Sequence, residues 1–248
     1  MTQFRKILFL IIIATAIVLL IIQETKKIKT VYINPNQDNV EIENKIVDLC
    51  FAKFSLPNER GLSDRYTLRM SIDNEKDTVA GELNFFPAEK DSKFGKFDGT
   101  VTEVDKIAMA RTVNAWWSAQ AEGMENKEEL KIIFGEGTAS VGFGEMVDNG
   151  DGVYVYKDPE NIFYTLELND VSCGELGERA SVESYIRENI STLSPVDAVL
   201  GGTWYVVSIW IDSTNKSGSV VYEDGHIQEI RDFTYELSGG VVSNAVIK

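Results

Sequence analysis

From Val47 to Asn169, apolar and polar residues alternate along the chain with a period close to two. The alternation is clearest at residues 66–72 and 79–85, which flank a polar turn at residues 73–77. This pattern is typical of a β-hairpin with one buried and one solvated face. It continues through eight or nine short segments joined by hairpin-length turns. A meander of that length closes to remove its free edges, so a mainly β chain with a closed, lipocalin-like antiparallel β-barrel is predicted at residues 47–174.

Residues 107–121 are rich in alanine and suit either a helix or a strand. The alternation and the adjacent tryptophans Trp116 and Trp117 favour a long strand. Neighbours in a strand point to opposite faces, and the face that includes Trp117 is the more apolar. We therefore expect Trp117 inside the barrel and Trp116 outside, against the second domain or at an interface with a partner. Arg111 shares the inward face, which predicts an acidic partner or a wet cavity.

Cys50 lies in the first predicted strand, and Cys173 follows the last. Barrel closure makes those two strands neighbours, so it brings the two sulfur atoms together. In an oxidising compartment two cysteines form a natural pair, and a bridge across so long a loop stabilises the fold by up to roughly 5 kcal/mol in the chain-entropy model. A Cys50–Cys173 disulfide is therefore predicted, with two buried thiols as the alternative.

Residues 180–248 are predicted to form a small α+β domain, with one helix on a four-stranded antiparallel sheet. Gly174–Arg179 is predicted to be a linker, and Ser181 to cap the helix that follows. Ser194-Pro195 ends this helix. The apolar residues of its expected buried face are Val182, Ile186, Ile190 and Leu193. Asp224-Gly225 predicts a two-residue hairpin turn between the second and third strands of the sheet.

Residues 7–22 comprise sixteen apolar or small residues without a charge. This run predicts an uncleaved transmembrane signal anchor at residues 1–23. A cleaved signal peptide, with Ala14-Thr15-Ala16 as a crude processing site, is the alternative. Residues 4–22 are expected to contact the lipid bilayer, and the polar residues 24–46 are predicted to form a stalk.

The expected location is the cell membrane, with a single pass, a cytoplasmic N-terminus and the bulk of the chain extracytoplasmic. The formal net charge of the chain is −15, and five of its 24 lysines and arginines lie in the first 30 residues. Such an acidic remainder repels phosphates, so nucleic acid is excluded as a partner.

The residues that could act in catalysis or bind a metal form no pattern that predicts a catalytic, metal or cofactor site. His226 is the single histidine and is expected to be exposed beside a hairpin turn. With one histidine and two cysteines that are expected to be bridged, a Cys/His zinc site is excluded. Asp148–Gly152 fits a Gly/Asn turn better than a calcium loop, and no G-x-S-x-G motif supports a hydrolase. The chain is therefore expected not to be an enzyme.

Two groups of motifs resemble known bacterial sequences. Trp116-Trp117 through Met124, Glu129-Leu130, and Gly142–Met146 through Tyr156 resemble an uncharacterised family of membrane-anchored bacterial envelope proteins. Gly201–Val206 with Tyr222–Ile227 resembles a small module common in bacteria of candidate phyla. The resemblance implies a location in the bacterial cell envelope, and it carries over no activity and no functional residues.

Three hypotheses for the function follow. The first is a membrane-tethered extracytoplasmic binding or adaptor protein for an envelope partner. The second is a lipocalin-like carrier of a small apolar ligand, with Arg111 and Trp117 as the ligand-binding residues. The third is a carbohydrate-active enzyme that uses two carboxylates about 5–9.5 Å apart.

Overall fold

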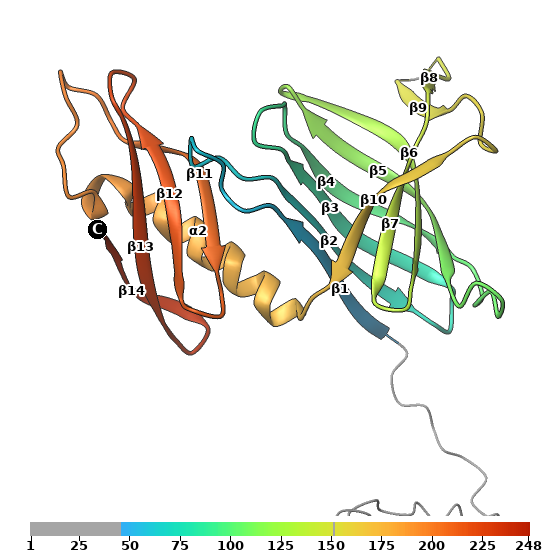
Figure 1. The fold of residues 1–248 in the computed structure, drawn as a ribbon. Coiled ribbons are helices and arrows are strands. Elements are labelled where there is room, and N and C mark those ends of the chain that lie inside the picture. Colours follow the sequence, from blue (N-terminus) through green and yellow to red (C-terminus); the bar gives the residue numbers. More distant parts are fainter. Residues whose placement is uncertain (1–45, 151) are drawn as a thin grey trace, which may run out of the picture. The chain divides into compact units, whose positions relative to one another are not determined.

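The computed structural model describes residues 46–150 and 152–248 (Figure 1). Eight of its strands form a closed antiparallel barrel, which confirms the predicted architecture. They are β1 (Ile46–Phe54), β2 (Arg65–Asp73), β3 (Thr78–Phe86), β4 (Lys93–Val101), β5 (Arg111–Ala121), β6 (Met124–Gly135), β7 (Thr138–Phe143) and β10 (Phe163–Asp170). Consecutive strands of this series pair with one another, and the pairing of β10 with β1 closes the ring.

The strands β8 (Met146–Asp148) and β9 (Val153–Tyr156) form a hairpin outside the barrel wall. The meander was predicted to run without a break from Val47 to Asn169, and for this hairpin the prediction is wrong. The last residues of β6 pair with β7, whereas Lys127 and Glu128 near its start are free to pair with β9 in parallel. The predicted turn at Asp148 is confirmed, because its Oδ1 accepts hydrogen bonds from the backbone N–H groups of Gly150 and Gly152.

Apolar side chains fill the interior of the barrel. Their buried members include Phe51, Leu68, Met70, Ile72, Val79, Leu83, Phe97, Val113, Trp117, Leu130, Ile132, Val141 and Leu168. Gly81 makes room for one of them, because a Cβ atom at this position would lie 2.5 Å from Cζ of Phe97. Interiors of this kind are close-packed, and small barrels commonly pack solid.

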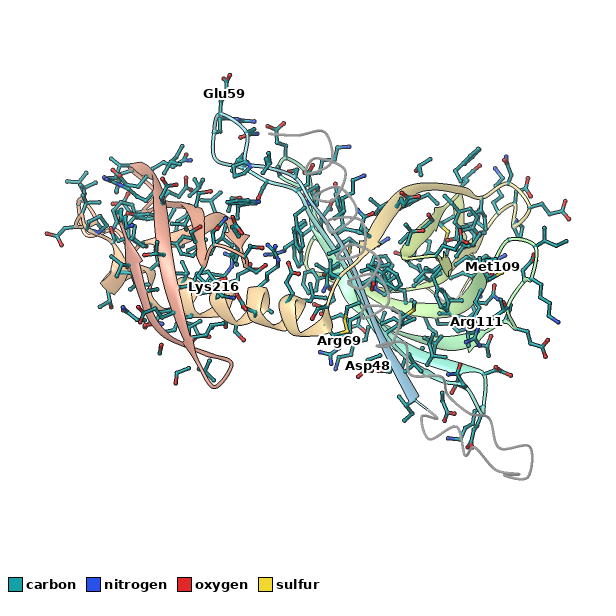
Figure 2. All side chains as sticks on the ribbon, turned by 60° about the horizontal axis from the view of Figure 1, so that its bottom comes forward. Asp48, Glu59, Arg69, Met109, Arg111 and Lys216 are labelled. Atoms are coloured by element: carbon teal, nitrogen blue, oxygen red, sulfur yellow. A yellow bond between two sulfur atoms is a disulfide. The ribbon has the colours of Figure 1, made fainter. Side chains whose placement is uncertain are left out.

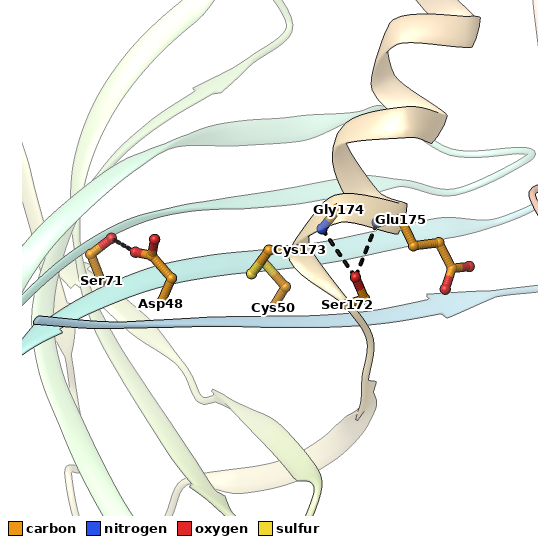
Figure 3. Close-up of a disulfide and its surroundings, with 7 residues drawn as sticks. All are labelled: Asp48, Cys50, Ser71, Ser172, Cys173, Gly174 and Glu175. Atoms are coloured by element: carbon orange, nitrogen blue, oxygen red, sulfur yellow. Dashed lines mark hydrogen bonds between the residues drawn. A yellow bond between two sulfur atoms is a disulfide. The ribbon is translucent and has the colours of Figure 1, made fainter. Parts of the chain in front are cut away.

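The predicted disulfide is present: Cys50 of β1 is bonded to Cys173, and their Cα atoms are 5.2 Å apart (Figure 3). The backbone supports this junction, since the N–H of Val171 donates a hydrogen bond to the carbonyl oxygen of Cys50 at 2.9 Å. Barrel closure therefore positions the two cysteines, as the order of the strands predicted.

The helix α2 (Cys173–Leu193) begins at the disulfide. The predicted linker Gly174–Arg179 and the predicted cap Ser181 are therefore wrong, because these residues are helical. The cap is Ser172, whose Oγ accepts hydrogen bonds from the N–H groups of Gly174 at 3.1 Å and Glu175 at 3.4 Å (Figure 3). A capped, covalently fixed first turn outweighs the low helix propensity of two glycines. The predicted buried face is correct for Val182, Ile186 and Ile190.

One face of a four-stranded antiparallel sheet packs against α2 and confirms the predicted α+β module (Figure 1). Its strands, in order, are β11 (Tyr205–Asp212), β12 (Ser217–Glu223), β13 (Gln228–Ser238) and β14 (Val241–Ile247). The turn between β12 and β13 has four residues, not the expected two. Asp224 causes the difference: it is buried, and its Oδ1 accepts hydrogen bonds from the N–H groups of His226 and Ile227. His226 itself is exposed, as expected.

The predicted anchor at residues 1–23 and the stalk at residues 24–46 lie outside the described residues, apart from Ile46 at the start of β1. Across residues 46–150 and 152–248, no helix combines the length and the apolar character needed to cross a membrane.

Candidate functional site

The described residues, 46–150 and 152–248, belong to one compact unit, and a groove of about 270 Å³ lies between the barrel wall and the α+β module. One wall of this groove is the outer face of β2 and β3, and the other is formed by the first half of α2 together with β11. Its lining combines aromatic, aliphatic and charged side chains, the composition of many ligand sites. Three of the eight arginines of this acidic chain line it: Arg65, Arg69 and Arg179.

The two-residue period of the strands directs an ordered row of side chains into the groove. Outward residues of β2 and β3 lie opposite one another in three successive pairs: Arg65 with Phe86, Thr67 with Asn84, and Arg69 with Glu82. The residues between them point inward and belong to the barrel core, for example Leu68 and Leu83. The pattern that builds the barrel interior thus also builds the floor of the groove.

Two of the three arginines are already neutralised. Arg65 forms an ion pair with Glu183 of α2, and its guanidinium group lies 4.5 Å from the centre of the Phe86 ring. Arg179 pairs with Glu175 at 2.9 Å and lies 4.4 Å from the centre of the Phe54 ring. These contacts join the barrel to the helix and hold both arginines in place, so their charges are largely offset.

Two polar groups that line the groove lack a full set of partners. Arg69, labelled in Figure 2, is exposed and lies opposite Glu82 of β3. No ion pair or hydrogen bond joins its side chain to the described part of the chain. The Oδ1 atom of Asn84 is buried without a hydrogen-bond partner, although its Nδ2 donates to Thr67 and Glu82. A buried acceptor left in this state costs about 1–3 kcal/mol.

Two of the α2 residues that line the groove, Gly177 and Ala180, are small. A Cβ atom at Gly177 would meet no other atom within 4 Å, so packing does not require glycine there. Glycine inside a helix is destabilising by roughly 0.5–1 kcal/mol relative to alanine. The neighbouring lining residue Ala180 is also small. These residues leave open space where larger helix formers would fill the groove.

Beyond the groove, Glu175 and Glu178 of α2 are paired and ionised. Hydrogen bonds from Arg179 and then Ser213 lower the pKa of the Glu175 carboxyl, against the opposing effect of burial. Burial raises the pKa of Glu178, but hydrogen bonds from Lys216 and Tyr235 outweigh it, and the net pKa is lowered. Both carboxylates are therefore charged at neutral pH and engaged with their own partners.

The residues predicted to bind a ligand, Arg111 and Trp117, do not come together in a cavity. Trp117 is buried, and its Nε1 donates a hydrogen bond to the carbonyl oxygen of Gly95 at 3.1 Å. Arg111 lies about 20 Å away along β5, at the other end of the barrel. Its side chain binds the carbonyl oxygen of Thr102 and Oδ1 of Asn74, with Oδ1 of Asp77 at 3.5 Å. Neither residue lines the groove.

Trp116 lies on the outer face of the barrel, as expected, with 37% of its surface exposed. It sits between Asp98 of β4 and Glu129 of β6, and the ammonium group of Lys127 lies 5.4 Å from the centre of a Trp116 ring. Trp116 is not part of the groove lining, so the groove and the predicted interface are separate surfaces.

Sequence reasoning missed the groove. Arg65 and Glu183, which meet at its edge, are 118 positions apart in the chain. One feature of the sequence could have indicated the groove: Arg65 and Arg69 are two cations on the polar face of one strand in a strongly acidic chain.

Within residues 46–150 and 152–248, no group of three or more His, Cys, Asp or Glu side chains is placed to hold a metal ion. Comparison of the chain with protein families, with curated proteins and with solved structures finds no significant match.

Proposed function

We propose that this chain is a membrane-tethered, extracytoplasmic binding or adaptor protein without catalytic activity, and that the groove is its binding site. The observation that carries this proposal is the exposed Arg69, which forms no ion pair with the described residues, in a groove that also contains Phe54, Phe86 and Trp210. Concave surfaces that combine apolar walls with a few free polar groups are the usual form of ligand sites.

Two further observations support the proposed location. The uncharged apolar segment at residues 7–22 has the composition of a signal anchor. The Cys50–Cys173 disulfide fits an oxidising compartment outside the cytoplasm. The motif resemblance to bacterial envelope proteins points to the same compartment, the bacterial cell envelope.

The alternative functions receive less support. A carrier of the lipocalin type needs space inside the barrel, where Trp117 and its neighbours pack against one another. A carbohydrate-active enzyme needs a carboxyl group with a raised pKa as its acid. Glu183, one of the acids lining the groove, is instead held by both Arg65 and Arg187. We therefore retain the binding protein as the single proposal.

The location can be tested with reporter proteins fused after Lys248. The full chain should give an active alkaline phosphatase, which folds only outside the cytoplasm, and a dark green fluorescent protein. Deletion of residues 1–23 should reverse both results. A fluorescent fusion of the full chain, together with an inactive phosphatase fusion, would contradict the proposed orientation.

The binding site can be tested by photocrosslinking in cells from two exposed outward positions. Benzoylphenylalanine at Glu82, on the groove, should give one adduct of defined mass, and Gly177→Leu should abolish it by filling the groove. The same group at Asp98, opposite Trp116, serves as the matched control. An adduct from Asp98 alone would reject the groove and place the binding surface at Trp116.

A further inference from the structure

The loop between β4 and β5, residues 102–110, presents large apolar side chains to solvent. Ile107 is 97% exposed, and Val104 and Met109 are more than half exposed. Met109 is labelled in Figure 2. Single exposed apolar residues are common on protein surfaces, whereas several gathered in one place mark a surface for a protein or a membrane. This loop therefore calls for a partner that the described residues do not supply.

Hydrogen bonds hold the loop in this form. Oδ1 of Asp105 accepts from the N–H groups of Ile107 at 2.8 Å and Ala108 at 3.2 Å. The N–H of Asp105 donates to the carbonyl oxygen of Ala110 at 2.8 Å and closes the base of the loop. Met109 has a φ of 50°, a left-handed conformation that few residues with a side chain adopt. The loop is thus fixed with Ile107 directed away from the barrel core.

The described chain begins at the same end of the barrel as this loop. Ile46, the first residue of β1, is exposed and pairs with Asp73, which precedes the turn between β2 and β3. Arg111, which follows the loop, donates to Oδ1 of Asn74 in that turn at 2.8 Å and lies 3.5 Å from Oδ1 of Asp77. The start of β1 and the β4–β5 loop therefore flank one turn at one end of the barrel (Figure 1). We call it the entry end.

The sequence before the entry end contains the uncharged apolar segment at residues 7–22. Only residues 23–45 separate this segment from β1, and 23 residues reach at most about 80 Å. A bilayer that holds the segment is therefore linked to the entry end and not to the opposite end. Linkage raises the effective concentration of the membrane at the loop, so a shallow insertion that is weak by itself becomes effective.

The charges of the loop indicate which property of a membrane it would bind. Two acids, Glu103 and Asp105, and one cation, Lys106, give residues 102–110 a net charge of −1. Anionic headgroups attract clusters of lysine and arginine, and this loop has no such cluster. Its attraction for a bilayer must come from apolar side chains that enter the interface, where binding grows with the apolar area buried. A zwitterionic bilayer suits this chemistry.

We propose that the β4–β5 loop is a second membrane contact, which inserts Ile107 and Met109 into the interface of the bilayer that holds the N-terminal segment. The contact turns the entry end of the barrel toward the membrane. It keeps the groove on the aqueous side, because Phe54, Arg65 and Phe86 lie at the opposite ends of β1, β2 and β3. This inference rests on the proposed function, since it requires a tethered chain.

Photocrosslinking to lipid tests the contact with the full chain in phosphatidylcholine liposomes. Benzoylphenylalanine at Ile107 should give a phospholipid adduct, measured by mass spectrometry. Leu56, which is 77% exposed in the loop after β1 at the opposite end of the barrel, is the matched control and should give at least tenfold less adduct. Equal yields at the two positions, or no adduct at Ile107, would overturn the proposal. An adduct that forms only after phosphatidylglycerol is added would also overturn it, because charge and not apolar insertion would then hold the loop.

A double variant shows whether the two apolar side chains carry the insertion. Benzoylphenylalanine at Val104 should label lipid in the wild-type background and about tenfold less in Ile107→Ser, Met109→Ser. Leu56→Ser is the matched control and should leave the yield at Val104 unchanged. Because both replaced side chains of the double variant are exposed, its thermal unfolding should match that of the wild type. An undiminished yield in the double variant would contradict the insertion of these residues.

The same label in cells separates this inference from its alternatives. A lipid adduct at Ile107 supports it, whereas a protein adduct in place of lipid would reject it and make the loop a docking site for a protein. An active phosphatase fusion without a lipid adduct would reject the loop contact and leave the tether in place. A fluorescent fusion with an inactive phosphatase would reject the tether and the loop contact together.

Discussion

At the scale of single residues, adjacent tryptophans experience opposite environments. Trp117 is 4% exposed and packs edge-on against Phe85, with ring centres 5.5 Å apart. Trp116, one residue earlier, is on the outer surface of the barrel. The pleat of the strand alone produces this difference, because successive side chains point to opposite faces. The two residues therefore form a natural pair for measuring what burial contributes to stability.

Replacing Trp117 by alanine should lower the free energy of unfolding by about 3–5 kcal/mol, because it leaves a cavity in the barrel core. Replacing Trp116 by alanine should cost less than about 1 kcal/mol. Urea unfolding followed by far-ultraviolet circular dichroism measures both values. Similar losses for the two variants would contradict the inward and outward assignment.

The lowered pKa of Glu175 predicts that the fold loses stability in acid. Hydrogen bonds from Arg179 and Ser213 lower its pKa in the folded state, so the folded chain binds fewer protons than the unfolded chain as pH falls. Its contribution is present above the unfolded pKa and is lost as pH drops through the folded pKa. The stability of the wild type should fall more steeply than that of Glu175→Gln below about pH 4, by less than about 1 kcal/mol for this partly exposed pair. Glu188→Gln, on an exposed part of the same helix, is the control and should follow the wild type.

At the scale of elements, α2 shows how local signals compete. Its first turn contains Gly174 and its second contains Gly177, which argues against a helix on propensity alone. The cap at Ser172 and the ion pair between Glu175 and Arg179 act in the opposite direction. The disulfide at Cys173 fixes the position where the helix begins. Because this first turn is held in place, forming the helix nucleus costs less conformational entropy.

Ser172→Ala should destabilise the fold by about 1 kcal/mol, because the N–H groups of Gly174 and Glu175 lose their acceptor. Ser172→Asp should restore most of this loss. Ser191→Ala removes a hydroxyl from an exposed position in the body of the same helix and should have little effect. Equal losses at Ser172 and Ser191, measured by urea unfolding, would show that the cap contributes nothing.

At the scale of the whole molecule, three of the contacts that join the barrel to the α+β module in the described residues lie far apart in the chain. The first is the disulfide at the start of α2, and the second is the ion pair of Arg65 with Glu183. The third is Gly61 in the loop between β1 and β2, where a Cβ atom would lie 2.6 Å from Cγ2 of Val221. With a φ of 73°, Gly61 adopts a conformation that favours glycine as well. These connections keep the two walls of the groove together.

Removal of the disulfide in the double variant Cys50→Ala, Cys173→Ala should lower the free energy of unfolding by about 2–5 kcal/mol, because the unfolded chain loses a long-loop constraint. A reducing agent should produce the same shift in the wild type and none in the double variant. If the reduced and oxidised wild type unfold at the same urea concentration, the bridge does not stabilise this fold.

The predictions that are confirmed and those that are wrong differ in how local their physical causes are. The inward position of Trp117, the barrel strands and the buried face of α2 follow from side-chain periods of two and 3.6 residues, which nearby residues alone specify. The predicted start of α2 is wrong because the disulfide holds Cys173 to a strand more than 100 residues earlier in the chain. The predicted length of the turn after β12 is wrong because Asp224 also accepts a hydrogen bond from the distant N–H of Val199 at 2.6 Å.

By itself the sequence determined which residues lie inside the barrel and the partnership of Cys50 with Cys173, because alternation and strand order are properties of the chain. Only the tertiary structure decided that Arg69 and Asn84 face α2 across a groove. Their placement depends on the register of β2 with β3 and on the path of a helix that begins after the barrel has closed. Residues this far apart in the chain meet through packing, and no local pattern encodes that meeting.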